Sequence, residues 1–444
     1  MRKLSPVLCL ALALAAPVCL FSQAKNVELN PHASYVDVAA RRAELKHTGS
    51  ERIRTALEHL GTCGTQAVVD PPAGPMRIPM HYLHGGHGPI NPAEHVQTAV
   101  YESFEKRVTA GMNQFLATGS HAEAQCAQDQ IDRWAQANTL MDYDAVDNPQ
   151  SWYQTEWTLS SVSTSESVLL NDAKLDKAET ARDVAWMNKV AHRMIGFPVE
   201  AAHHNNHHYW RGLAAIAAGV ISSDQELFAF GVQAFKDGVD EIDQRGAFPK
   251  EMARSERSIH YQSFALQPLI PLAEFAERQH VPLFSYTSAT GRTIADAIDF
   301  LGKAVADPSI VKVYTPEEQM VDSDAPDFFA PIEFYAHRFP ERKLPASIAE
   351  ALTKPTYATR LGGSTMVLAG RQSGANLLRR GGRRPIAGNV RCSRRGHSRF
   401  NHRGCGEGSI LERALGADHV ANLDVSQSDG IAALAEGGVF VGDE

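Results

Sequence analysis

The stretch NNHHYWRGLAAIAAGVI at residues 205–221 begins with amide and imidazole side chains and continues with small, apolar ones. Because residues 209–221 are small and apolar, they predict a helix that is buried inside the protein. A second stretch, RSERSIHYQSFALQPL at residues 254–269, belongs to another predicted helix, 252–279. Helix signals are plentiful around both stretches and strand signals are scarce, so the sequence favours an all-α fold.

Helix signals continue on both sides of this centre. A helix is predicted at residues 92–118, because Asn91-Pro92 is a helix-start signal and apolar residues recur after it at helical spacing. Further helices are predicted at residues 122–138, 156–171, 178–194, 224–242 and 291–306, with short Gly- and Pro-containing turns between them. The pattern indicates an array of helical hairpins without a fixed-period repeat.

The two ends of the chain differ from this helical body. Residues 1–24 combine Arg2 and Lys3 with an apolar run at 7–21, which is typical of a signal peptide. We therefore expect export to the periplasm or beyond, with no membrane association after cleavage. Residues 25–369 form the expected domain. Residues 370–444 contain eleven arginines and no lysine, and we interpret them as a disordered extension or a shifted reading frame.

The net charge of the chain limits which kinds of molecule it can attract. The chain carries a formal net charge of −8, so its overall field attracts neither a nucleic acid nor another polyanion. An anionic polysaccharide would need a locally basic cleft, for which the candidates are Arg77, Arg254, Arg257 and Arg338.

The polar ends of the two quoted stretches carry the candidate chemistry. Asn206 and His207 supply an amide and an imidazole, while Arg254 and Tyr261 supply a guanidinium and a phenol. On one helix, positions 254 and 261 share a face and lie roughly 10 Å apart along the axis. These groups suit proton removal beside a carboxylate. Asn206 and Arg254 would neutralise the carboxylate, and His207 would neutralise it or accept a proton. Tyr261 would transfer the proton, with nearby arginines favouring its anion.

The two motifs resemble a known family. NNHHYW and Arg254-x6-Tyr261, at this separation, resemble the alginate lyases, the poly-mannuronate lyases of polysaccharide lyase family 5. The similarity runs from residue 37 to 368 and includes Arg360-Leu-Gly-Gly363 near its end. The resemblance implies an (α/α) toroid, an incomplete barrel of helical hairpins with a long cleft and a lid loop. It also implies that Tyr261 acts as both base and acid.

The resemblance assigns further residues around the cleft. It implies that residues 68–91 form the lid and supply Tyr82, preceded by His81 where many relatives have a basic residue. It also pairs Cys63 with Cys126 in a disulfide, which an oxidising compartment would favour; two separate buried thiols are the alternative.

Sugar contacts are expected in NPQSWYQTEWTL at residues 148–159. The resemblance places them at Gln150 and Trp157, although Trp152 and Gln154 fit the same pattern in a shifted register. Arg338 is a candidate for contact with a distant carboxylate, or for a surface ion pair.

A metal site is the first alternative for the histidine-rich motif. Positions 203/207 and 204/208 stand four apart, as on one helix face, but no third ligand is evident nearby. We therefore expect no metal and no cofactor. His207 also fits a core histidine, and Arg254 and Tyr261 also fit an exposed helix face.

Two other functions compete with the lyase. A glycoside hydrolase on a helical toroid would need two carboxylates across the bond, and none lies in the two motifs. A non-catalytic polysaccharide-binding or secretion-scaffold protein would not need an intact set of catalytic residues. The combination of both motifs favours a monomeric lyase that cleaves mannuronate-rich alginate, or other polyuronates, endolytically by β-elimination.

Overall fold

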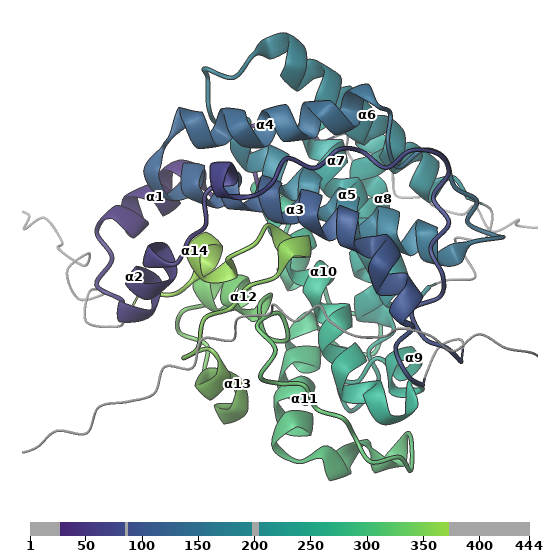
Figure 1. The fold of residues 1–444 in the computed structure, drawn as a ribbon. Helices are drawn as coiled ribbons and strands as arrows, with labels where there is room; N and C mark the ends of the chain where they lie inside the picture. The colour runs from purple at the N-terminus through teal and green to yellow at the C-terminus, as the bar shows by residue number, and fades with distance from the viewer. Residues whose placement is uncertain (1–26, 85–87, 198–203, 373–444) are drawn as a thin grey trace, which may run out of the picture. The chain divides into compact units, whose positions relative to one another are not determined.

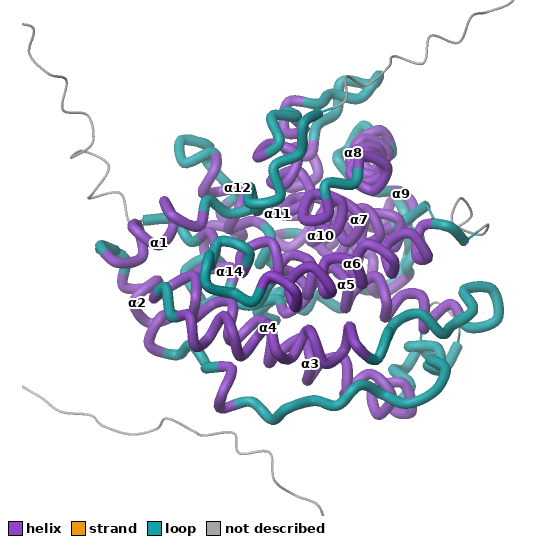
Figure 2. Tube along the Cα trace, turned by 90° about the horizontal axis from the view of Figure 1, so that it is seen from above, coloured by secondary structure: helices purple, strands orange, loops and turns teal. Residues whose placement is uncertain are grey.

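The structure is a computed structural model that describes residues 27–84, 88–197 and 204–372, all within one structural unit. The predicted signal peptide lies outside the described residues, as does the predicted tail apart from residues 370–372. No strand forms in the described part of the chain, where the β contacts are two isolated bridges, Tyr82 with Ile90 and Ala358 with Gly363. Figure 2 accordingly shows helices and loops alone in these residues, which confirms the all-α prediction.

Fourteen α-helices are defined within the described ranges (Figure 1). They are α1 (Val38–Lys46), α2 (Glu51–Glu58), α3 (Pro92–Thr118), α4 (His121–Gln136), α5 (Pro149–Leu169), α6 (Lys177–Ile195), α7 (Asn206–Ser222), α8 (Gln225–Asp240), α9 (Pro249–Met252), α10 (Ser258–Arg278), α11 (Ile294–Ala306), α12 (Ile332–Arg338), α13 (Ala346–Ala351) and α14 (Thr365–Ala369). None of the described helices is long and apolar enough to cross a membrane.

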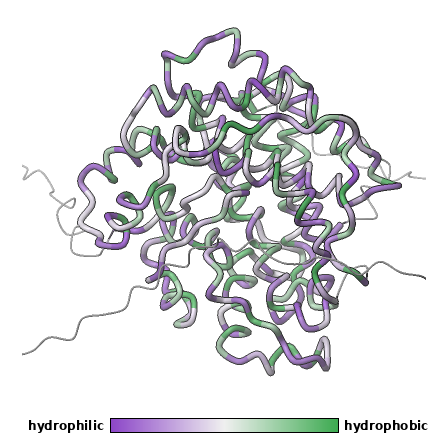
Figure 3. The backbone as a smooth tube through the Cα atoms, in the orientation of Figure 1, coloured by the Kyte–Doolittle hydropathy of each residue, from purple (hydrophilic) through white to green (hydrophobic). Residues whose placement is uncertain are grey.

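Burial alternates along the chain between inner and outer helices. The helices α5, α7 and α10 are buried on nearly every side, whereas α4, α6 and α8 each keep one exposed face. The inner helix α7 packs against α5, α6, α8 and α10. In Figure 3 the hydrophilic colour is concentrated on the outer loops, which agrees with this arrangement. Each hairpin therefore contributes one inner and one outer helix.

Two glycines allow the closest of these packing contacts. A Cβ atom at Gly212 of α7 would lie 2.6 Å from the Cβ of Ala234, and one at Gly231 of α8 would lie 2.5 Å from the Cβ of Ile216. Both distances are shorter than carbon atoms tolerate. The hairpin α7–α8 can pack this tightly only because the two positions have no side chain.

The inner helix α5 is buried although its sequence is rich in serine and threonine. The side chains of Ser160, Thr164 and Ser165 each donate to the backbone carbonyl four residues earlier, at 2.8 Å. These bonds satisfy the hydroxyl groups without water. The helix begins at Pro149, earlier than the predicted residue 156, because the side chain of Asn148 caps its first turn.

The segment before α10 also differs from the prediction. A single helix over 252–279 was expected, but α9 ends at Met252, a 3-10 turn spans Ser255–Arg257, and α10 begins at Ser258. Ser255 has φ of 55°, a left-handed conformation that interrupts helical geometry. Arg254 and Tyr261 therefore do not share one helix.

The predicted disulfide between Cys63 and Cys126 is present. It joins the segment that follows α2 to the middle of α4, and so fixes one end of the long loop that leads to the cavity described next.

Candidate active site

A cavity of about 570 Å³ lies where the loop before α3 meets α3, α5, α7 and α10. Most of the predicted site residues line it, from four separate parts of the chain: His81, Tyr82, Gln150, Trp157, His207, Arg254 and Tyr261. Asn206 and Arg338 do not. Gln154 also lines the cavity whereas Trp152 is buried in the core, so the register with Gln150 and Trp157 places both predicted residues at the cavity.

Tyr261 lies at the centre of the constellation. Its hydroxyl donates to the hydroxyl of Tyr82 at 3.1 Å, and the Cζ atom of Arg254 lies 3.6 Å from the centre of its ring. Burial raises the pKa of Tyr261 above that of a free phenol, and the positive charge of Arg254 opposes this shift. The expectation that a nearby arginine favours the anion agrees with the effect of Arg254, but desolvation is the larger effect and the net pKa is raised.

The loop containing Tyr82 covers the cavity. Tyr82 is buried, and a β bridge to Ile90 closes the turn that carries it. Arg257 lies 5.0 Å from the centre of the Tyr82 ring. The backbone N–H of His81 donates to Gln150 at 3.3 Å, and the His81 ring lies 3.2 Å from Glu94. These contacts join the loop to α3, α5 and the segment before α10.

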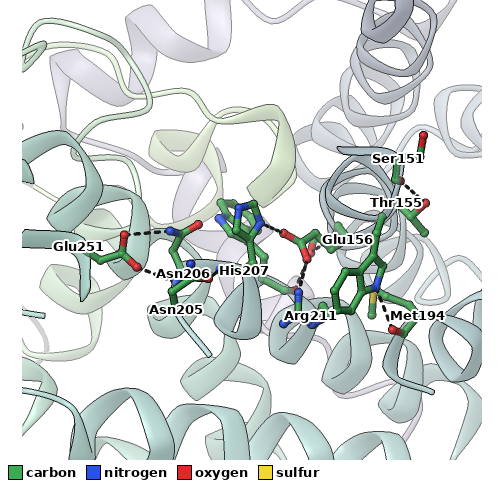
Figure 4. A network of polar contacts seen from close by, with 12 residues as sticks. Ser151, Thr155, Glu156, Met194, Asn205, Asn206, His207, Arg211 and Glu251 are labelled. Atoms are coloured by element: carbon green, nitrogen blue, oxygen red, sulfur yellow. Dashed lines mark hydrogen bonds and ion pairs between the residues drawn. The ribbon is translucent and has the colours of Figure 1, made fainter. Parts of the chain in front are cut away.

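Asn206 begins α7 and is fully buried behind the cavity wall (Figure 4). Its backbone N–H donates to Glu251 at 2.7 Å, and its side-chain amide donates to the other oxygen of Glu251 at 2.9 Å. Burial raises the pKa of Glu251 to about 7, and the hydrogen bonds from Asn206 oppose the shift. The predicted donor thus already binds a carboxyl group of the protein, and its neighbour Asn205 lines the cavity instead.

His207 connects the cavity to a buried ion pair. Its Nδ1 atom lies 2.5 Å from Oε1 of Glu156, and Oε2 of Glu156 lies 3.0 Å from Nη1 of Arg211. Figure 4 shows the carboxylate between the imidazole and the guanidinium. Glu156 and Arg211 are fully buried. The ring of Tyr153 stacks on His207 with the ring centres 3.6 Å apart.

Arg360 is a site residue that the sequence reasoning missed. It was noted as part of a family-like motif but was not assigned to the cleft. Its Cζ atom lies 4.0 Å from the centre of the Trp157 ring, and both residues line the cavity. The signal that could have identified it is a lone arginine next to paired glycines, Gly362 and Gly363, which both have positive φ.

Arg338 lies away from this cavity. It lines a second cavity of about 230 Å³ and forms a hydrogen-bonded ion pair with Glu274, with one N–O distance of 2.7 Å. Of the two interpretations of Arg338, the ion pair is the one that this geometry favours. Arg77, named as a candidate for a basic cleft, is also absent from the lining of the main cavity.

A group with metal-ligand chemistry lies next to the site. Side chains of His204, His208 and Asp237 each bring a ligand atom within 4.8 Å of the others. The two imidazole rings, however, stack with centres 4.0 Å apart and planes 12° apart. An ion must lie near the plane of each ring that binds it, and nearly parallel planes do not meet at one point. His208 instead lies 3.0 Å from Asp237.

The class of protein follows from the reaction that these groups can support. A buried phenol beneath a guanidinium, with an imidazole in the same cavity, can move a proton next to a carboxylate, which is the chemistry of a polysaccharide lyase. The sequence pattern of the alginate lyase family matches residues 30–311, and the chain belongs to that family.

Similar proteins and structures agree with this assignment. A polysaccharide lyase of Stenotrophomonas maltophilia (strain K279a) is 29% identical over 310 residues, which cover 67% of this chain and 89% of that protein. Alginate lyase A1-III from Sphingomonas species A1 is 37% identical, with a TM-score of 0.71 over 78% of this chain and 97% of that one. A variant of alginate lyase A1-III in complex with a tetrasaccharide is 36% identical, with a TM-score of 0.74 over 79% of this chain and 98% of that one. The (α/α) toroid prediction is thereby confirmed.

Proposed function

We propose that this alginate lyase cleaves mannuronate-rich alginate endolytically by β-elimination. The observation that carries the proposal is the position of the Tyr261 hydroxyl, which is in the cavity, bonded to Tyr82 and beneath Arg254. We also propose export, since residues 1–24 have the composition of a signal peptide. Binding of an anionic chain is supported by Arg254 and Arg360, which place positive charge in the cavity of an otherwise acidic protein.

The elimination breaks the C5–H and C4–O4 bonds and forms a C4–C5 double bond. A base removes H5, the electron pair of the C5–H bond forms the C4–C5 double bond, and O4 leaves with its bonding electrons and takes up a proton. Negative charge builds on the C6 carboxylate during this step, so donors fixed beside that group stabilise the transition state. Arg254 and His207 supply those donors from the cavity wall, whereas Asn206 is buried behind them and donates its amide to Glu251.

Tyr261 is proposed as both base and acid. In β-mannuronate, H5 and O4 lie on the same side of the ring, so a single group can take the first proton and deliver it to O4. The base form of Tyr261 is a phenolate, and the groups that can stabilise it are the guanidinium of Arg254 and the hydroxyl of Tyr82. Because burial raises the pKa of Tyr261, we expect activity to be greatest on the alkaline side of neutrality.

Endolytic action is proposed because the cavity offers contacts for more than one sugar. Trp157 and Gln150 line the cavity and bring an indole and an amide to its wall. Such groups suit sugar hydroxyls. The similar structure that was solved with a tetrasaccharide supports binding of several sugar units by this fold.

The test uses purified protein with poly-mannuronate, poly-guluronate, poly-glucuronate and hyaluronan, with a chelator present. We expect ultraviolet absorbance to rise, fastest with poly-mannuronate, while viscosity falls early, as internal cleavage requires. Tyr261→Phe should abolish the rise, whereas Tyr101→Phe, which removes a buried phenol outside the cavity, should leave it unchanged. New reducing ends without absorbance would indicate a hydrolase, and no product from any polymer would indicate a binding protein.

A further inference from the structure

We propose that the buried pair Glu156–Arg211 positions His207 and keeps its imidazole protonated, so that His207 donates to the substrate carboxylate and does not act as a base. This inference rests on the proposed function and deepens it, because it assigns one of two chemical roles to His207. It also identifies Glu156, which contacts no substrate, as a determinant of which uronate is cleaved.

The Glu156 carboxylate bridges His207 and Arg211. One carboxylate oxygen lies 2.5 Å from Nδ1 of His207, and the other lies 3.0 Å from Arg211. Arg211 is in turn fixed by Trp152, whose ring centre lies 4.1 Å from its Cζ atom and whose indole N–H donates to the Met194 carbonyl at 2.9 Å. Figure 4 shows the part of this chain that runs from Arg211 through Glu156 to His207.

These contacts decide which ring nitrogen carries a proton. A carboxylate only accepts hydrogen bonds, so Nδ1 of His207 must carry hydrogen. The ring nitrogen that substrate can reach is then Nε2, which is an acceptor when the ring is neutral and a donor when it is protonated. A neighbouring negative charge favours the protonated ring. Arg211, on the far oxygen, keeps Glu156 ionised.

The presence of the buried ion pair Glu156–Arg211 is not explained by a gain in folding stability. Both Glu156 and Arg211 are fully buried, and removing two charges from water costs several kcal/mol per ion, which their attraction offsets only in part. A pair of apolar residues of similar volume would stabilise the core about as well. The charges are better explained by what they do to the third member of the chain, His207.

Other groups around the imidazole modify this balance without reversing it. The ring of Tyr153 stacks on His207, and an aromatic face attracts a cation. Burial raises the pKa of Tyr153 to about 12, so this phenol stays neutral. Arg254 lies in the same cavity and disfavours a second positive charge. Charged and titratable groups among the described residues near the ring include Tyr153 and Glu156 in contact with it, Arg211 behind Glu156, and Arg254, His260, Tyr261 and Arg360 in the same cavity.

The consequence concerns substrate stereochemistry. In guluronate, H5 and O4 lie on opposite sides of the ring, so Tyr261 cannot serve as both base and acid, and His207 would have to accept H5. A protonated imidazole has no lone pair with which to do so. The negative charge of Glu156 therefore favours mannuronate, where His207 is needed only as a donor.

The experiment compares wild type with Glu156→Gln. Nuclear magnetic resonance would follow the His207 ring across pH, with its signal assigned by its loss in His207→Gln. We expect the ring to titrate at least about one pH unit lower in Glu156→Gln, the usual effect of losing an adjacent opposite charge. Glu166→Gln, which removes a second buried carboxyl from α5 away from the cavity, should titrate as wild type does.

Activity gives a second readout on the same proteins. In Glu156→Gln we expect kcat/KM on poly-mannuronate to fall about tenfold or more, while the ratio of poly-guluronate to poly-mannuronate activity rises. If Glu156→Gln does not fold, the double variant Glu156→Gln with Arg211→Met leaves no unpaired buried charge. It should shift in the same direction by a smaller amount, because loss of the Arg211 charge opposes the shift and Arg211 lies on the far oxygen of Glu156. Equal titration of His207 with and without the Glu156 charge would overturn the inference. An inactive wild type would overturn the proposed function, and the titration would still report on Glu156.

Discussion

Replacing Glu166 by glutamine tests how burial of an acid couples stability to pH. Glu166 lies in the inner helix α5 and is fully buried, and Gln128 is the polar side chain that opposes the effect of this burial on its pKa. Burial raises its pKa from 4.5 to about 8. Asp183 on α6 is also buried, and burial together with the charge of Glu166 raises its pKa to about 9. The folded protein therefore holds protons that the unfolded chain releases.

The direction of the effect follows from the raised pKa. The contribution of Glu166 to stability is fully present below pH 4.5 and is lost as the pH rises towards about 8. Each unit of pKa difference corresponds to about 1.36 kcal/mol, so the difference of about 3.5 amounts to roughly 5 kcal/mol in total. Between pH 5.5 and 7.5 the loss is roughly 2–3 kcal/mol. Glutamine keeps the shape of the protonated acid but does not titrate, so the variant escapes this loss.

The assay is thermal or urea unfolding at pH 5.5, 6.5 and 7.5 for wild type and Glu166→Gln. We expect the unfolding free energy of the variant to gain roughly 2–3 kcal/mol on that of wild type across this range. At an unfolding entropy of about 2.1 cal/mol/K per residue, this gain is roughly 3 °C in Tm. Glu350→Gln, at an exposed position of α13, provides the control and should gain nothing. A difference between wild type and Glu166→Gln that stays constant from pH 5.5 to 7.5 would refute the reasoning.

Three further predictions concern binding and packing. Arg360→Met should raise KM for poly-mannuronate about tenfold with little change in kcat, because it removes positive charge from the cavity; an equal fall in kcat would contradict a binding role. Gly231→Ala should cost about 1–3 kcal/mol in urea unfolding, since its Cβ would lie 2.5 Å from that of Ile216; wild-type stability would show that the hairpin can relax. Replacing both Cys63 and Cys126 by serine removes the disulfide and should lower the unfolding free energy by about 2–4 kcal/mol. Urea unfolding of the variant, of wild type and of reduced wild type would check this, and reduced wild type should match the variant.

Local signals in the sequence were sufficient for many of the helices. The helix predicted at 92–118 agrees with α3, because Asn91 caps its first turn, Pro92 suits the first helical position and Gly119 ends it in a left-handed conformation. The same kind of signal was missed before α5, where Asn148 and Pro149 begin the helix earlier than its apolar residues suggest. Capping is a property of neighbouring residues and can be read from them.

The sequence by itself determined the helical hairpins and, through its two motifs, the alginate lyase family, since both depend on residue types at short spacing. Most of the site residues that it predicted line the cavity. The tertiary structure alone decided how those residues are used. It brings Glu156 to His207 from 51 positions away, places Tyr82 of the loop on Tyr261, and makes burial outweigh the arginines in setting the pKa of that phenol. Burial and long-range contact arise from the packing of distant helices, and no local pattern encodes them.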